Sequence, residues 1–289
     1  MVLKKILNLP EKFTHTRLRN ACEESGAEVF AKLRIADVFP IEGSGITDKL
    51  YGYALKAHFD FLVTDAKQNP LFAVEFDGPS HDLPDQEYLD AQKNELCERF
   101  ELPLLRINRR YLTKNYGSLD LLTWFIEVWF LERGFEAAQL SGHIPMDEPF
   151  DYRWLWQDGE KGRRWDLSVE AREGIRRLSD EERCWDPGAS WIVGTESAGT
   201  YRALGYLRIT PSEGITVITA MQKQRFPAPI DELLGDIVTT KLYQRLLAVL
   251  EGREVAESVK VINESITNFE RRYKFVSASS VSRGTPLRR

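Results

Sequence analysis

Acidic residues at alternating positions in two neighbouring apolar runs constrain the fold more than any other feature of this chain. The first run, 58–64 (HFDFLVT), carries Asp60; the second, 71–76 (LFAVEF), carries Glu75 and is followed by Asp77. Because side chains two apart in a strand point to the same face, we expect Glu75 and Asp77 to lie together. Three carboxylates gathered at the ends of paired strands repel one another unless a cation is present. The pattern therefore predicts a divalent metal site at the ends of two strands.

The segments around these runs indicate how the strands are connected. Residues 65–70 (DAKQNP) are rich in turn formers and suit an antiparallel hairpin. Residues 40–57 contain several glycines and Pro40 and are expected to form mostly a loop. The predicted elements are, in order, a helix (11–24), strands (27–38, 58–64 and 71–76), a helix (85–101), a strand (103–107) and a helix (119–133). We therefore expect an α/β (α+β) fold with a mixed sheet of about four strands flanked by helices, whose last strand is reached through a helical crossover.

The composition changes beyond residue 142, which predicts a second domain. Five of the seven tryptophans lie between residues 154 and 191, and packing in a core or interface is a better explanation for them than base stacking. Strand-like runs at 203–210 and 214–221 and helices at 230–251 and 254–273 follow. We expect domains at 1–140 and 145–275, the second a smaller α+β domain of unknown role, and a disordered tail at 276–289.

Cysteine usage and hydropathy limit the cellular setting. The three cysteines are far apart and form no C-x-x-C pair, which excludes a cysteine-based zinc site and argues against a disulfide framework. No stretch approaches 18 uninterrupted apolar residues. We therefore expect a cytoplasmic protein with no membrane association.

A longer layout emerges when the acidic runs are read together with the charged residues that follow them. Its members are Asp60-Phe61, the run from Val74 to Gly78, His81, Asp90, Lys93 and the run from Leu104 to Arg106. This layout resembles the PD-(D/E)XK nuclease superfamily. It is most similar to the very-short-patch-repair-like branch and to a related uncharacterised bacterial family, which share a DF…IExDG…H…DxxK/R…LR pattern. The resemblance covers roughly residues 11–133.

The resemblance implies a restriction-endonuclease-like core with the element order αβββαβα. It further implies a nuclease that hydrolyses phosphodiester bonds in DNA, in repair, restriction or defence against mobile elements. The cofactor would be Mg²⁺ or Mn²⁺, which prefer carboxylate oxygen. The residues implied as metal ligands are Asp60, Glu75 and Asp77. Lys93 and His81 complete the implied catalytic set, with Glu11, Asp90 and Arg106 in support.

One position departs from the superfamily pattern and opens an alternative. Asp77 stands where the usual E-x-K motif has its lysine, so Lys93 would have to act from the helix. The alternative is a catalytically inactive module on a nuclease fold that binds nucleic acid or a protein partner. A further possibility is that residues 145–289 carry the main function, for instance as a protein-interaction domain.

Simpler explanations exist for most of these residues taken singly. Asp60 could cap a turn, and His81 could be an ordinary loop histidine. Asp90 and Lys93 could form a solvated pair on a helix face. Arg106 could make a buried salt bridge to Asp60 or Asp77 instead of contacting a phosphate.

The net charge of the chain and the expected cleavage of two strands bear on its binding partners. The net charge of −5 arises entirely from residues 1–139, whereas nucleic-acid binders usually carry a basic excess. A bound divalent ion and local basic patches would offset this charge. We expect a nucleic-acid partner, DNA rather than RNA, and a homodimer would suit cleavage of both strands.

Overall fold

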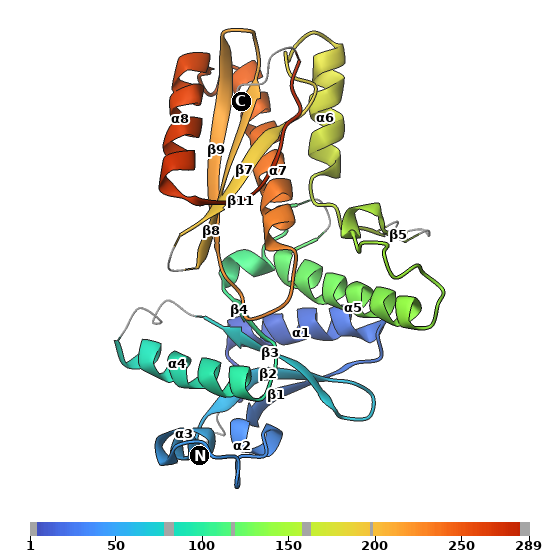
Figure 1. The fold of residues 1–289 in the computed structure, drawn as a ribbon, viewed down its shortest axis with the longest axis vertical. Coiled ribbons are helices and arrows are strands. Elements are labelled where there is room, and N and C mark those ends of the chain that lie inside the picture. The colour runs from blue at the N-terminus through green and yellow to red at the C-terminus, as the bar shows by residue number, and fades with distance from the viewer. Residues whose placement is uncertain (1–4, 78–83, 117–118, 158–162, 197–198, 284–289) are drawn as a thin grey trace. The chain divides into compact units, whose positions relative to one another are not determined.

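A computed structural model describes residues 5–77, 84–116, 119–157, 163–196 and 199–283 (Figure 1). The chain divides into two compact units. The first comprises Met1–Asn115, Leu119–Tyr152 and Gln224–Ala228, and the second comprises Tyr116–Ser118, Arg153–Lys223 and Pro229–Arg289.

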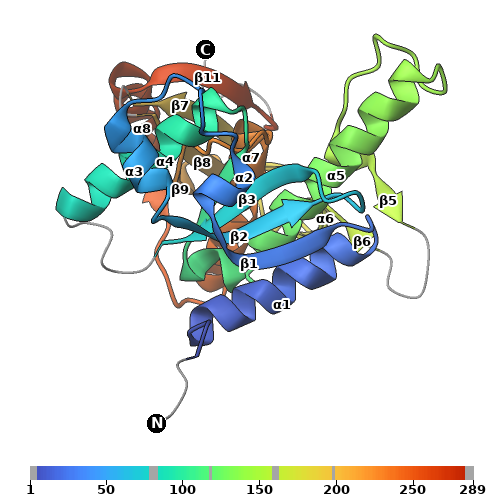
Figure 2. The same ribbon diagram turned by 90° about the horizontal axis from the view of Figure 1, so that it is seen from below.

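The first unit is built on a mixed four-stranded sheet with the order β1-β2-β3-β4, of which β1, β2 and β3 are labelled in Figure 2. Its elements are α1 (Leu9–Glu23), β1 (Glu28–Arg34), α2 (Ile35–Val38), α3 (Asp48–Ala54), β2 (His58–Thr64), β3 (Pro70–Phe76), α4 (Pro84–Arg99), β4 (Leu104–Ile107), the 3-10 helix η1 (Arg109–Leu112) and α5 (Leu121–Leu140). β1, β2 and β3 pair antiparallel, and β4 joins β3 in parallel after the α4 crossover. The predicted meander and crossover are confirmed.

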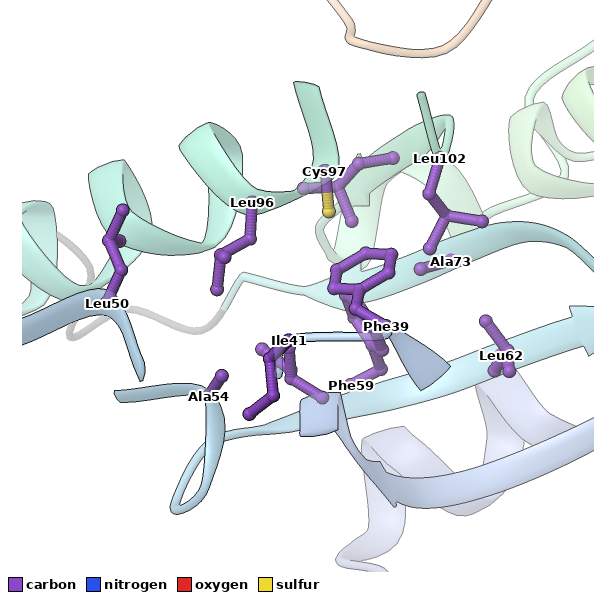
Figure 3. Close-up of a cluster of buried hydrophobic side chains, with 12 residues drawn as sticks. Phe39, Ile41, Leu50, Ala54, Phe59, Leu62, Ala73, Leu96, Cys97 and Leu102 are labelled. Atoms are coloured by element: carbon purple, nitrogen blue, oxygen red, sulfur yellow. The ribbon is translucent and has the colours of Figure 1, made fainter. Parts of the chain in front are cut away.

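The two faces of this sheet bury different apolar sets. Beneath α4, a cluster draws on β2, β3, β4 and the short helices α2 and α3, and includes Phe59, Ala73 and Leu96 (Figure 3). On the other face Phe61 stacks on His15 of α1, and aromatic side chains of α5 pack against β3. α1 and α5 also contact each other. The sheet is therefore covered on both faces, and its strands contain the near-continuous apolar runs that such burial requires.

The edge of the sheet at β4 is covered by Gln224–Ala228, a segment more than a hundred residues further along the chain. The Leu104 amide donates to the carbonyl of Arg225 at 3.0 Å, and Phe226 packs its ring against Phe72 and Phe125. This segment shields an edge that would otherwise present unpaired backbone groups.

Three predicted boundaries were wrong in this unit. β1 ends at Arg34, and residues 35–38 form α2 instead of continuing the strand. The expected loop at 40–57 contains α3, because Leu50 and Ala54 are buried in the cluster beneath α4. The final helix continues seven residues beyond 133, to Leu140. Tertiary packing outweighed the local glycine and proline signals at 40–57.

The second unit is an antiparallel five-stranded sheet, ordered β10-β9-β8-β7-β11, with three long helices and a separate two-stranded ribbon. Its elements are the 3-10 helix η2 (Tyr152–Trp154), which begins on the last residue of the first unit, β5 (Trp156–Gln157), β6 (Arg163–Arg164), α6 (Val169–Asp180), β7 (Ser190–Thr195), β8 (Thr200–Arg208), β9 (Glu213–Gln222), α7 (Ile230–Leu250), β10 (Glu257–Ser258), α8 (Val259–Arg272) and β11 (Lys274–Ser279). The predicted β8–β9 hairpin and the helices α7 and α8 are present. α6, β7 and β11 were not predicted.

Two further expectations for this unit differ from the structure. Residues 276–279, placed in a disordered tail, belong to β11, which pairs with β7. Of the clustered tryptophans, Trp165 is buried as expected, whereas Trp154 is almost fully exposed. Within the described residues, no helix combines the length and apolar character needed to cross a membrane.

Candidate functional site

Asp60 and Glu75 interlock across the paired strands β2 and β3. The Asp60 amide donates to Glu75 Oε1 at 3.1 Å, and the Phe76 amide donates to Asp60 Oδ2 at 2.9 Å. Each carboxylate is thus oriented by the backbone of the strand that carries the other. Such reciprocal bonds hold the two side chains in a fixed relation near the ends of both strands.

Lys93 reaches this pair from α4. Its Nζ lies 2.5 Å from Glu75 Oε2 and 2.9 Å from the carbonyl oxygen of His58. Its side chain is only 10% exposed and Glu75 is 8% exposed. Lys93 therefore serves chiefly as the buried counter-ion of Glu75.

Lys32 reaches the pair from β1. Its Nζ lies 2.6 Å from Asp60 Oδ1 and 2.9 Å from Oε1 of Glu11. Glu11 is placed by the start of α1, where its side chain and Asn8 form a capping box. We call Glu11, Lys32, Asp60, Glu75 and Lys93 the strand-end cluster.

The backbone at Lys32 departs from ordinary strand geometry. Its φ of 56° lies in the left-handed region, which costs an L-residue about 1–2 kcal/mol. The register holds on both sides, with Ala31 opposite Phe61 and Leu33 opposite Phe59. Yet Phe61 stacks on α1 whereas Phe59 joins the cluster beneath α4. The side chains of β2 therefore do not alternate strictly between the two faces of the sheet around Asp60, the residue across from Lys32.

A second charged group lies beside the first and is centred on Arg106 of β4. Its Nη1 lies 3.1 Å from Asp77 Oδ1 and 3.2 Å from Asp90 Oδ1, and its Nη2 lies 3.2 Å from Oδ1 of Asn94. Arg106 is aligned with Glu75 across the parallel strands. The Arg106 amide in turn donates to Gln224 Oε1 at 3.0 Å.

Burial and neighbouring charges shift two pKa values in the strand-end cluster. Burial raises the pKa of Glu75, and it outweighs the opposing effect of Lys93. Burial alone would lower the pKa of Lys32, but its hydrogen bonds to Asp60 and Glu11 raise it above the ordinary value. Lys32 thus carries its positive charge at any physiological pH.

The charges of the strand-end cluster do not balance. Its three carboxylates (Glu11, Asp60 and Glu75) face two lysines (Lys32 and Lys93) in the contacts described above. With all five ionised, the cluster carries an excess of one negative charge, which favours a bound cation.

The chemistry of the donors suits Mg²⁺ or Mn²⁺. Hard cations of this kind take one or two carboxylates and complete their shell with water, and Asp60 and Glu75 offer two carboxylates from adjacent strands. Across the described ranges, no three His, Cys, Asp or Glu side chains are gathered closely enough to hold an ion by themselves. Asp60 and Glu75 would therefore hold the ion together with water or backbone oxygen.

The predicted site residues fall into three sets. Asp60, Glu75 and Lys93 lie together, and Glu11 joins them through Lys32. Asp77, Asp90 and Arg106 form the adjacent group, in which Asp77 is paired with Arg106. His81 lies outside the described residues.

Sequence reasoning missed Lys32, Asn94 and Gln224. The sequence did contain a signal for Lys32. If the strand with the sequence AKLR pairs antiparallel with the strand that carries Asp60, its lysine lies on the strand next to that carboxylate. Asn94 stands one residue after Lys93 on the predicted helix. Nothing local marks Gln224, because its role depends on a contact between distant parts of the chain.

Residues 3–117 match a protein family described as "Protein of unknown function (DUF2726)". The match spans every predicted site residue, from Glu11 to Arg106, and ends before α5. No curated protein and no solved structure matches the chain significantly.

Proposed function

We propose that the first unit is a divalent-metal-dependent nuclease that hydrolyses phosphodiester bonds in DNA, on a restriction-endonuclease-like core of the PD-(D/E)XK type. The observation that carries the proposal is the interlocked Asp60–Glu75 pair at the strand ends. The element order supports it as well, with helix, three-strand meander, crossover helix and parallel strand following one another.

The roles of the residues follow from their positions. Asp60 and Glu75 would hold Mg²⁺ or Mn²⁺, and the ion supplies the Lewis acidity that phosphodiester hydrolysis requires. Lys93 opposes the effect of burial and favours the ionised form of Glu75. In the overall reaction a water oxygen bonds to phosphorus, the bond from phosphorus to the leaving oxygen breaks, and the leaving oxygen takes a proton.

The test is cleavage of single- and double-stranded DNA by purified full-length protein with Mn²⁺. Removing either metal-holding carboxylate should reduce the rate by at least about 100-fold, since electrostatic stabilisation of the transition state is lost. The variants are Asp60→Ala and Glu75→Ala. Glu28→Ala, at the exposed start of β1, is the matched control and should retain the wild-type rate. Metal-dependent cleavage that survives both site variants would refute the site assignment.

One observation favours a second candidate, a catalytically inactive module that binds nucleic acid or a protein partner. All four side-chain oxygens of Asp60 and Glu75 accept a hydrogen bond from protein nitrogen, and Asp77 is paired with Arg106. A binding module predicts affinity for DNA that falls steeply with salt and no turnover with any divalent ion. Detectable cleavage that depends on Asp60 would exclude it.

A further inference from the structure

Two lysines contact the Asp60–Glu75 pair, and their surroundings differ. Lys93 is enclosed: its ammonium group bonds Glu75 and a backbone carbonyl, and it lies 5.8 Å from the centre of the Phe59 ring. With a side chain only 10% exposed, it has little access to a solvated phosphodiester. Its ammonium group therefore faces the interior of the first unit.

Lys32 is open to solvent by comparison. Its side chain is 32% exposed, and its two partners are themselves partly exposed. An ammonium group has three N–H donors, of which two bond Asp60 and Glu11 in the described structure. Lys32 can therefore add a contact on the solvent side without leaving the cluster.

The backbone of Lys32 is held in a strained conformation that places this side chain. A residue in the left-handed region inside a strand persists only where its surroundings over-determine it, and such residues gather at functional sites. This strained residue lies opposite Asp60, where the side chains of β2 stop alternating between the two faces of the sheet. The local backbone thus sets the direction in which the ammonium group approaches the carboxylates.

Lys32 also engages the oxygen of Asp60 that accepts no backbone hydrogen bond. Oδ2 of Asp60 is bound by the Phe76 amide at 2.9 Å, so Oδ1 is the oxygen without a backbone donor, and Lys32 Nζ lies 2.6 Å from it. A divalent ion that binds Asp60 must displace the ammonium group or share the carboxylate with it.

Building on the nuclease function proposed above, we infer that Lys32 is a catalytic residue that donates a hydrogen bond to the scissile phosphate. In the absence of substrate it competes with the divalent ion for Asp60 Oδ1. Once displaced from Asp60, the Lys32 ammonium group would neutralise charge on the phosphate while keeping its bond to Glu11. Lys32 remains protonated throughout and transfers no proton.

The experiment measures Mn²⁺ affinity by calorimetry and DNA cleavage at saturating Mn²⁺ on the full-length protein. Lys32→Met should bind Mn²⁺ about tenfold more tightly, or about 1.4 kcal/mol, because the competing cation is gone. The same variant should cleave about 100-fold more slowly, as expected when one transition-state contact is lost. Tighter ion binding with slower cleavage is a combination that a purely structural lysine would not produce.

Two further variants control for charge and folding. Lys12→Met removes one positive charge from the exposed face of α1, next to Glu11, and should match wild type in both measurements. Lys32→Arg keeps the charge and should bind Mn²⁺ within about threefold of wild type while cleaving faster than Lys32→Met. Urea unfolding confirms that each variant is folded.

The outcomes separate this inference from the proposed function. Wild-type protein that binds no Mn²⁺ and cleaves no DNA would overturn both. Wild-type cleavage that depends on Asp60, together with Lys32→Met that cleaves normally or binds Mn²⁺ no more tightly, would overturn the Lys32 inference alone.

Discussion

The strand-end cluster of the first unit and the Asp186–Arg208 pair of the second unit both keep charges beneath the surface, but in opposite ways. In the pair, Arg208 donates to both oxygens of Asp186 through Nε, Nη2 and its backbone amide. The Arg283 amide adds another bond, and both side chains are less than 10% exposed. This arrangement matches one planar cation to one carboxylate and closes it off from solvent.

The strand-end cluster uses lysines, which are point charges that shift position easily. Its carboxylates outnumber its basic side chains, and Lys32 and Asp60 remain partly exposed. The difference teaches that burial of charge alone does not indicate function. A closed bidentate pair holds a fold together, whereas an open, unbalanced group of carboxylates and lysines can exchange one cation for another.

The largest expected effect tests the closed pair. Asp186→Ala should lower the free energy of unfolding by about 3–5 kcal/mol, because the buried Arg208 guanidinium loses the carboxylate that pairs with it. Urea unfolding followed by circular dichroism measures it, and adding Mn²⁺ should not change the loss.

The matched control for this variant is Glu196→Ala. It removes a single bond to Arg202 from a pair that is about a third exposed, and the expected loss is below about 1 kcal/mol. Equal losses in the two variants would contradict the structural role assigned to Asp186.

An intermediate effect should appear as a pH dependence in the open cluster. Because the pKa of Glu75 is raised in the folded protein, the folded state binds the proton more tightly than the unfolded chain. The contribution of this proton to stability is complete below the unfolded-state pKa and is lost as pH rises through the folded-state pKa. A tenfold difference in proton affinity between the folded and unfolded states corresponds to about 1.4 kcal/mol of stability.

The measurement compares wild type with Glu75→Gln in urea, free of divalent ions, at several pH values from 4 to 8. The variant should gain stability relative to wild type as the pH rises. Glu95→Gln, on the exposed face of α4, is the control. A stability difference between Glu75→Gln and wild type that stays constant over this range would show that the pKa of Glu75 is the same in the folded and unfolded states.

The smallest expected effect concerns the strained backbone of the open cluster. Glycine normally destabilises a strand relative to alanine by about 0.5–1 kcal/mol. At position 32 the order should reverse, and Lys32→Gly should be more stable than Lys32→Ala by about 1 kcal/mol, because glycine adopts the left-handed region without cost. The same exchange at the neighbouring residue, Ala31→Gly, should be destabilising. If alanine is the more stable residue at position 32, the strand is not strained there.

The open cluster was easier to foresee from sequence than the closed pair. β2 was predicted with its observed ends, and the pairing of β2 with β3 brought Asp60 and Glu75 together, because a short hairpin and period-two alternation are local signals. Lys93 was implied by the resemblance, and the sequence predicted the helix that carries it. These inferences needed only contacts between neighbouring elements.

What sequence could not supply depended on distant contacts or strain. Lys32 was missed because its φ is imposed by the folded sheet. β11 was missed since its partner β7 lies some eighty residues earlier in the chain. The Asp186–Arg208 pair likewise requires the turn before β7 to meet the end of β8. α3 was hidden by Gly52, whose low helix propensity was overridden by burial of the residues around it.

The return of Gln224–Ala228 to the edge of β4 has a consequence for anyone who divides this protein. A fragment ending near residue 140 would contain every predicted ligand yet lack the acceptors of the Leu104 and Arg106 amides and the ring of Phe226. Such a fragment would expose a β-edge prone to pairing with other chains. No single truncation therefore separates the complete first unit from the rest of the chain. An N-terminal fragment without nuclease activity would not show that the full-length protein is inactive.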